Sequence, residues 1–335
     1  MFSWLCREIL FPTRQCIPVW TGLMTFLPQI EQLDVVLYPS DKDYAAFREA
    51  VYVLLSHDGT FQIGYLLPIV VEKLATTKLV TVDTTARTVQ LAQELTTLEQ
   101  RNTALNELAS YWRKKDYFST LRGWRDELYT IYSPDKQPYI LLERAACPLL
   151  GVVMYGVHIN GYVKTAGEVK LWIPRRSATK QTFPGMLDNT VAGGLGYPHG
   201  PFETCVKECY EEAGLPEEFV RQNLKPAGQV SYFYQAEAGN YSSEAGLLQP
   251  ELQYVYDLEM SAELVPKPVD NEAEDFQLLD IPQVCELIRA GKFKPNCAGV
   301  IVDFLMRHGY LTAENEQNMD TIHAKLHRKL PFPIR

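Results

Sequence analysis

Residues 193–215 read GGLGYPHGPFETCVKECYEEAGL, and this stretch decides how the rest of the chain is interpreted. It contains a glycine-rich turn, a short segment that opens with a proline, and a glycine exit at Gly214. Proline favours the first turn of a helix and glycine favours its end, so the spacing predicts a helix between them. Residues i, i+3 and i+4 of a helix share one face, which brings together Glu208, Glu211 and Glu212.

The three helix glutamates predict a metal site. Carboxylates crowded on one helix face repel one another, and a hard divalent cation relieves that repulsion. Mg²⁺ typically binds a few carboxylates and completes its shell with water and substrate phosphate oxygens. We therefore expect Glu208, Glu211 and Glu212 to hold Mg²⁺, with Mn²⁺ as an alternative, and to act on a phosphate compound. The other interpretation, an ordinary solvated acidic face, is disfavoured by the flanking glycines and the strand-like residues 190–192.

The spacing resembles the Nudix box, G-x5-E-x7-R-E-U-x-E-E-x-G-U, where U is an aliphatic residue. Gly193 and Leu215 take its first and last positions, and all three helix glutamates are present. Three positions depart from the pattern: His199 replaces the first Glu, Lys207 replaces the Arg, and Cys209 replaces an aliphatic residue. The resemblance implies that the helix glutamates bind the metal and catalyse the reaction. The first two departures put the shape of the loop in doubt more than the metal site.

Longer stretches resemble one group of Nudix proteins, found in fungi and plants, that carry a domain of unknown function (DUF4743) ahead of the Nudix fold. The same pair of domains precedes the kinase in some fungal thiamine pyrophosphokinases. The stretches that carry this likeness are residues 63–68, 123–129, 156–162, 172–177, 184–189, 254–258 and 292–296. The resemblance implies an α/β fold, in which a Nudix α/β/α sandwich with a mixed sheet follows a mainly helical N-terminal domain.

The resemblance also implies an activity. It is the Mg²⁺-dependent removal of the terminal phosphate from thiamine diphosphate, or from damaged forms such as oxythiamine and oxothiamine diphosphates, to give the monophosphate. Two alternatives stay open. The first is a pyrophosphatase that cleaves ADP-ribose or a dinucleotide, and the second is a Nudix fold kept only as a binding module.

Basic residues after a predicted strand are candidates for binding the substrate phosphates. Arg175, Arg176 and Lys180 follow the segment 171–174, and arginine offers bidentate contacts to phosphate. The alternative is a solvated basic turn. Three aromatic side chains have the option of stacking on a substrate ring, although core packing is the expected role of each: Trp172, Tyr232 and Tyr234.

Composition limits the partners. The chain has 335 residues and a net charge of −9, which argues against a general nucleic-acid surface and leaves a small-molecule diphosphate as the expected partner. No run approaches the roughly 18 apolar residues of a membrane span. The seven cysteines show no C-x-x-C spacing, and Cys205 and Cys209 are expected on the buried side of the acidic helix. We expect a cytosolic protein, or a mitochondrial one if residues 1–23 act as a presequence. The pattern predicts no oligomeric state.

The pattern predicts three parts: an extension over 1–23, an N-terminal DUF4743-like domain over 24–142, and a Nudix domain with C-terminal helices over 143–335. Helical spacing covers 43–55, 68–74 and 89–108, and a hairpin signal covers 127–132 and 139–143. Expected strands of the second domain are 151–163, 169–173, 230–235 and 252–258, and 236–249 is an expected loop. Expected closing helices are 281–290, 295–308 and 320–330.

Overall fold

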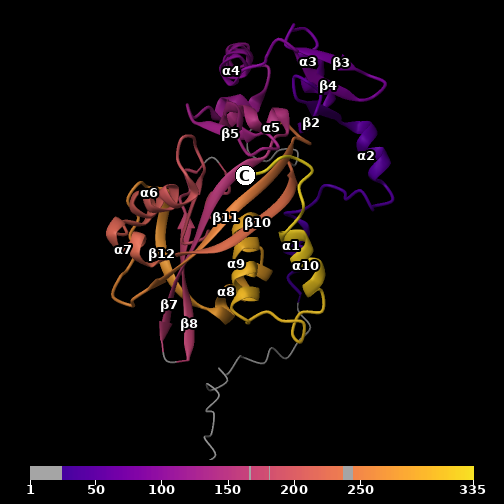
Figure 1. Cartoon of the computed structure of the whole chain (residues 1–335). Helices are drawn as coiled ribbons and strands as arrows, with labels where there is room; N and C mark the ends of the chain where they lie inside the picture. Colours follow the sequence, from indigo (N-terminus) through magenta and orange to yellow (C-terminus); the bar gives the residue numbers. More distant parts are fainter. Residues whose placement is uncertain (1–24, 166, 181, 237–243) are drawn as a thin grey trace, which may run out of the picture.

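The computed structural model describes residues 25–165, 167–180, 182–236 and 244–335 (Figure 1). The predicted extension over 1–23 and much of the predicted loop over 236–249 lie outside these residues. The described chain folds into a large sandwich and a smaller N-terminal region, which lies above the sandwich in Figure 1.

A six-stranded mixed sheet forms the centre of the sandwich, in the order β10-β11-β7-β8-β12, with β9 beside β7. The strands are β7 (Met154–Thr165), β8 (Glu168–Arg176), β9 (Val191–Gly194), β10 (Leu224–Gln235), β11 (Leu248–Met260) and β12 (Ala273–Asp280). β7 and β11 run parallel, and the other pairs are antiparallel. Since β9 and β11 flank the same residues of β7, segments far apart in sequence meet at one end of the sheet.

Helices cover both faces of this sheet. One face packs against α6 (Pro201–Ala213) and α7 (Glu217–Asn223). The other packs against α8 (Ile281–Arg289), α9 (Pro295–Arg307) and α10 (Met319–Leu326), together with α1 (Leu27–Glu31). The predicted α/β/α sandwich with a mixed sheet is confirmed.

The N-terminal region contains both β-strands and helices. Its strands β1 (Tyr52–Leu55), β2 (Gln62–Leu66), β3 (Val80–Asp83) and β4 (Thr88–Leu91) form a sheet in the order β2-β1-β4-β3. β5 (Leu128–Tyr132) and β6 (Pro138–Glu143) form a separate hairpin. The helices are α2 (Tyr44–Ala50), α3 (Pro68–Leu74), α4 (Leu98–Lys114) and α5 (Cys147–Leu150). The prediction of a mainly helical domain therefore overlooked a four-stranded sheet.

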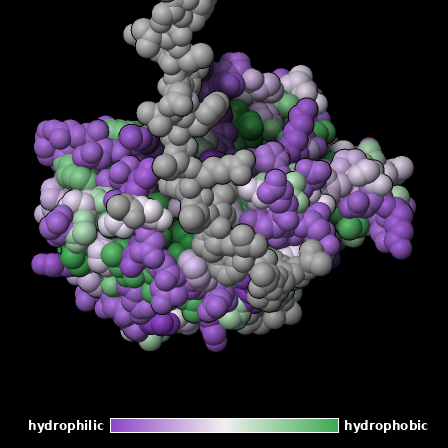
Figure 2. All heavy atoms as spheres, turned by 90° about the horizontal axis from the view of Figure 1, so that it is seen from below, coloured by the Kyte–Doolittle hydropathy of each residue, from purple (hydrophilic) through white to green (hydrophobic). Residues whose placement is uncertain are grey.

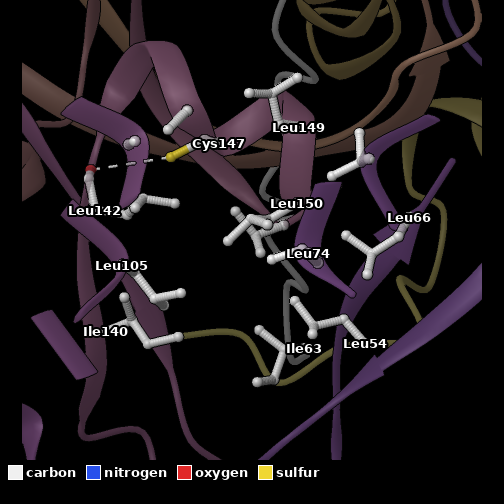
Figure 3. Close-up of a cluster of buried hydrophobic side chains, with 14 of the residues drawn as sticks. Leu54, Ile63, Leu66, Leu74, Leu105, Ile140, Leu142, Cys147, Leu149 and Leu150 are labelled. Carbon is white, nitrogen blue, oxygen red and sulfur yellow. Dashed lines mark hydrogen bonds between the residues drawn. The ribbon is translucent and has the colours of Figure 1, made fainter. Parts of the chain in front are cut away.

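Apolar side chains from helices and strands close the core of this region. Figure 3 shows Leu54 and Ile63 from the sheet facing Leu105 of α4 and Ile140 of β6. Leu74 of α3 lies between these groups, so the sheet, the hairpin and both helices share one core.

Two predicted helices of this region were too long. The predicted helix over 43–55 ends at Ala50, because the next residues are apolar, β-branched or aromatic and enter β1. The predicted helix over 89–108 begins only at Leu98. Thr97 accepts a hydrogen bond from the backbone of Gln100, whose side chain accepts one from the Thr97 backbone. This capping box fixes the start of α4.

Other elements match their predicted positions. The hairpin, α3 and the three C-terminal helices lie where the pattern placed them, apart from a few residues at the ends. The prediction missed α7 and β12. The β12 segment carries three acidic residues, which hides its strand character.

A shared apolar cluster joins the two regions. It combines Val53 and Tyr65 of the N-terminal sheet with Phe233 of β10 and Phe332 near the C-terminus. Beside it, Arg328 forms a buried ion pair with Asp34 at 2.9 Å. α1 lies beside α10 in Figure 1, so the first described residues belong to the sandwich.

The lower face of the molecule is mostly polar. Figure 2 shows hydrophilic residues predominating on the lower face, with apolar ones scattered among them outside the grey atoms. In the part of the chain that the structure describes, the helices are too short or too polar to cross a membrane.

Candidate functional site: an acidic helix beside an inter-region cavity

The acidic helix forms where the glycine and proline pattern predicts it. α6 begins at Pro201 and ends at Ala213, and its C-cap Gly214 has a φ of 63°, in the left-handed region that glycine tolerates. Cys205 and Cys209 are fully buried and anchor the helix on the sheet, as predicted. Gly193 is required for close packing, because a Cβ there would lie 2.6 Å from Cδ of Glu208.

Two of the helix glutamates face the sheet and meet further acids. Glu212 accepts a hydrogen bond from the Ala192 amide at 3.2 Å. Ligand oxygens of Glu212, Asp270 and Glu272 all lie within 4.8 Å of one another. Asp270 and Glu272 come from the loop between β11 and β12, so this acidic group joins two distant segments.

The electrostatics of this group fit a divalent cation. Burial raises the pKa of Glu208, and burial together with Glu208 raises the pKa of Glu212 well above its ordinary value. Buried carboxylates in mutual contact are costly unless a positive charge neutralises them. The donors are all carboxylate oxygens, which suits Mg²⁺ or Mn²⁺. A metal ion bound here supplies charge neutralisation at phosphate oxygens and lowers the pKa of a coordinated water.

Glu211 is placed differently from its two neighbours. Its side chain is 47% exposed and pairs with Lys207 at 2.9 Å. Lys207 also approaches Glu208 at 3.4 Å, so it stands over the acidic face from the position where the Nudix box has arginine. His199, which replaces the first Glu of the box, is exposed, and its backbone amide donates to the Gly196 carbonyl at 3.1 Å.

The three candidate phosphate-binding residues all have partners within the protein. Arg175 donates to the Gly185 carbonyl at 3.1 Å. Arg176 pairs with Asp188 at 2.6 Å and is mostly buried. Lys180 pairs with Glu272, one of the loop acids beside the helix. Of the three, Lys180 is bound directly to the acidic group.

A network of paired polar groups underlies the acidic site. Asp188 accepts hydrogen bonds from Arg176, from the Cys297 thiol at 2.6 Å and from the Asn189 amide at 2.8 Å. Burial alone would raise the pKa of Asp188, but Lys294 and Arg176 outweigh burial and hold it at about 2. His158 is bonded to Asn189 at 2.7 Å, and burial lowers the pKa of His158 to about 4. This network fixes the entry into β9.

A cavity of about 520 Å³ opens beside the acidic helix, between the sandwich and the N-terminal region. The sandwich contributes residues of β7, β9, β10 and β11, including Gly156, Gly193 and Gly194. The N-terminal region contributes the hairpin and the segment before it. Gly193 lines the cavity and also packs on Glu208, so the acidic group adjoins the cavity at this residue.

Positive charge gathers on the cavity wall. Four basic residues line it: Arg122, Arg125, Arg144 and Lys294. Arg144 lies next to Gly194, where a Cβ would approach its guanidinium to 3.0 Å. One nitrogen of Arg144 is bonded to Glu127 at 3.0 Å, and its side chain remains 38% accessible. Since a guanidinium has five N–H donors, Arg144 keeps several for an anion beside Gly194.

Of the cavity residues, the sequence pattern singled out Tyr232 and Tyr234 and missed most of the others, although three of the stretches quoted above supply several of them. Arg125 and Tyr129 lie in the stretch 123–129, Gly156 and His158 in 156–162, and Lys294 in 292–296. Glu272 had a local signal, the acidic run 270–275. Arg144 had none, because only the packing of the hairpin on the sandwich brings it to the site.

The comparisons with known proteins concern the chain's family and fold. Residues 55–154 match the family described as Domain of unknown function (DUF4743). "Uncharacterized protein YJR142W" of Saccharomyces cerevisiae is 40% identical over 319 residues, which cover 92% of each chain. "Nudix hydrolase 20, chloroplastic" of Arabidopsis thaliana is 42% identical over 204 residues. That match covers 59% of this chain and 51% of the plant protein, so the chain spans about half of that relative.

Among solved structures, the Nudix domain of Shewanella oneidensis NrtR complexed with ADP ribose is similar at a TM-score of 0.35 and 11% identity. The likeness covers 47% of this chain and 89% of that one. A similarity of this size has no bearing on the ligand of the present protein.

Proposed function

We propose that this chain, which belongs to the same family as the yeast protein YJR142W, is a Nudix hydrolase that hydrolyses thiamine diphosphate or its damaged analogues. These analogues are oxythiamine diphosphate and oxothiamine diphosphate. Water adds to the terminal phosphorus, the P–O–P bond breaks, and the products are inorganic phosphate and the monophosphate.

One observation carries the proposal: the cavity beside the acidic helix has a cationic end and an aromatic end. Arg144 lies at the β9 end, next to Gly194, where the acidic group adjoins the cavity. Tyr232 and Tyr234 line the β10 end. The order β9-β7-β11-β10 spans three strand spacings, or roughly 14 Å. That length accommodates a diphosphate at one end and a heteroaromatic head at the other.

The chain's own groups explain how the diphosphate is held. Arg125 and Lys294 form no ion pair within the described residues and are available to phosphate oxygens. Arg144 adds donors at Gly194, and arginine binds phosphate in a bidentate manner. Glu208, Glu212 and Glu272 would hold the metal ion, which would neutralise charge on the phosphates. We leave the catalytic base open between Glu211 and a loop carboxylate.

Arg175, Arg176 and Lys180 are also proposed to serve the phosphate end of the site. Arg176 keeps Asp188 and the entry to β9 in place, and Lys180 positions Glu272. Arg176 and Lys180 therefore act through other residues, while Arg175 remains a candidate for direct contact.

The proposal is tested by measuring phosphate release with Mg²⁺ from thiamine diphosphate, oxythiamine diphosphate, ADP-ribose and NADH. We expect inorganic phosphate from the thiamine compounds. The Arg144→Gln variant should lower kcat/KM by about tenfold or more, the cost of a lost charge-assisted contact of roughly 1.5–3 kcal/mol. Arg221→Gln, an exposed residue of α7 that pairs with Glu203, is the matched control and should leave turnover unchanged. AMP from ADP-ribose or NADH as the main product would contradict the proposal.

A further inference from the structure

Glu251 is the only carboxylate among the described residues that line the cavity, and it lies away from the acidic helix. It belongs to β11, pairs in register with Tyr232 of β10, and is adjacent to Met154 of β7. Its position is therefore on the floor of the aromatic end of the cavity. Burial raises the pKa of Glu251, while the charges of Lys294 and Arg144 reach it and act against burial. The carboxylate itself does not bind phosphate, because the two groups repel each other.

Neighbouring donors fix this carboxylate in one orientation. The Tyr232 hydroxyl donates to Oε2 of Glu251 at 2.5 Å, and Nε2 of Gln253 donates to the same oxygen at 2.7 Å. Nε2 of Gln253 also reaches the Tyr232 hydroxyl at 3.1 Å, which closes the cluster. The hydrogen bonds that Glu251 makes within the described residues all go to Oε2, so Oε1 is left for a group in the cavity.

A second polar atom of this cluster lacks a partner. Gln253 is only 5% exposed, and its Oε1 has no hydrogen-bond partner in the described part of the chain. A buried acceptor without a donor costs free energy, and a ligand donor is one way to recover it. Because Oε1 of Gln253 is enclosed by protein atoms, the acceptor that the cluster presents to the cavity is Oε1 of Glu251.

We propose that Glu251, held by Tyr232 and Gln253, binds the head group of the substrate and selects heteroaromatic heads that carry N–H donors or a positive charge. A ring cation gains from the carboxylate charge, and amino or ring N–H groups donate to it. Heads with only carbonyl or apolar edges leave the carboxylate desolvated and unpaired, which costs affinity. The proposal rests on the proposed function for the choice of thiamine compounds as probes, but not for the role of Glu251.

The experiment compares Glu251→Gln with wild type on substrates whose head groups differ. Thiamine diphosphate carries a positive ring and an amino group, ADP-ribose carries an amino group, and benzyl diphosphate carries neither. We expect the variant to lose about ten- to a hundredfold in kcat/KM on the first two, mainly through KM, because the amide keeps the shape and removes the charge. Turnover of benzyl diphosphate should change by less than about threefold.

Two further variants serve as a control and as a second test of Glu251. Glu259→Gln removes another β11 carboxylate that accepts from a tyrosine, Tyr162 at 3.0 Å, and it lies outside the cavity. It should behave as wild type on every substrate. Tyr232→Phe removes one hydroxyl that orients Glu251 and should give a smaller loss with the same substrate pattern. Circular dichroism and the Tm of each variant confirm that it is folded.

The outcomes separate this proposal from the proposed function. An equal loss on all three substrates, or no loss on any, would overturn the role of Glu251. If wild type cleaves ADP-ribose and not thiamine diphosphate, the proposed function fails, and the role of Glu251 is judged on ADP-ribose against benzyl diphosphate. A loss confined to benzyl diphosphate would also overturn it.

Discussion

Two groups of polar side chains, one around Asp188 and one around Glu212, line the same small pocket, and they differ in how their charges are paired. Around Asp188, a carboxylate meets a guanidinium, a thiol and a backbone amide, and His158 is bonded to Asn189. Around Glu212, three carboxylates meet, with Lys180 paired to Glu272. The charges of the first group are paired within the protein, whereas the second keeps an excess of negative charge that an added cation would neutralise. Pairing thus distinguishes the structural acids from the functional ones.

The largest effect should follow from neutralising the second group. Glu212→Gln is expected to lower kcat by roughly 10²–10³, the range seen when a key charge-stabilising group is lost. In Mg²⁺-free buffer its stability should equal or exceed that of wild type, because the amide relieves the repulsion with Glu208 and Glu272. Turnover is measured by phosphate release and stability by urea unfolding.

The matched control is Glu203→Gln on the same helix. Glu203 is exposed and pairs with Arg221, so its loss should leave kcat unchanged. If Glu212→Gln retained wild-type turnover, the metal site would lie elsewhere and the comparison would collapse.

Neutralising the first group should have the opposite effect. Asp188→Asn leaves Arg176 buried without its counter-charge, and breaking such a pair typically costs about 3–5 kcal/mol. We expect the free energy of unfolding to fall by about 3 kcal/mol, as measured by urea unfolding. A stability equal to that of wild type, together with lost turnover, would move Asp188 into the functional group.

The sequence predicted the second group in part and the first hardly at all. Glu208, Glu211 and Glu212 lie within one helix, where spacing alone fixes their relation. Spacing did not show that Glu211 pairs with Lys207 and lies exposed beside the other two glutamates, since this depends on side-chain conformations. Arg176 was predicted from its charge to bind phosphate, but its partner Asp188 is 12 residues away and is brought near by the β8 geometry.

The cavity lay beyond the reach of local pattern because strand register creates it. Glu251 faces Tyr232 and Gly156 neighbours Gly194 only once β11, β10, β7 and β9 are paired. Glu251 had no distinct local signal, because β11 also carries Asp257 and Glu259. The strands themselves were predicted, because β-branched and aromatic residues dominate them.

A third test adds Mg²⁺ to neutralise the acids around Glu212 instead of removing them. Mg²⁺ should raise the Tm of wild type in a concentration-dependent manner, since a ligand of the folded state at 100 times its Kd contributes about 2.7 kcal/mol. The same titration should leave the Tm of Glu212→Gln nearly unchanged, while Glu203→Gln should respond as wild type does. Equal shifts in all three proteins would show that Mg²⁺ acts elsewhere on the chain.

The smallest expected effect is a change in stability with pH, which tests whether His158 stays uncharged in the folded protein. Burial lowers the pKa of His158 to about 4 from its ordinary 6.5. Between these values the unfolded chain binds a proton that the folded chain does not, so the free energy of unfolding falls as pH falls. The slope is at most about 1.4 kcal/mol per pH unit for one group.

The measurement is urea unfolding at pH 6.0 and pH 5.0 for wild type, His158→Gln and His199→Gln. Wild type should lose more stability across this interval than His158→Gln, by up to about 1.4 kcal/mol. His199 is exposed, so its variant should follow wild type. Equal losses in wild type and His158→Gln would mean that His158 takes up its proton in the folded state. The first group would then contain a charge without a partner, and pairing would no longer separate it from the acids around Glu212.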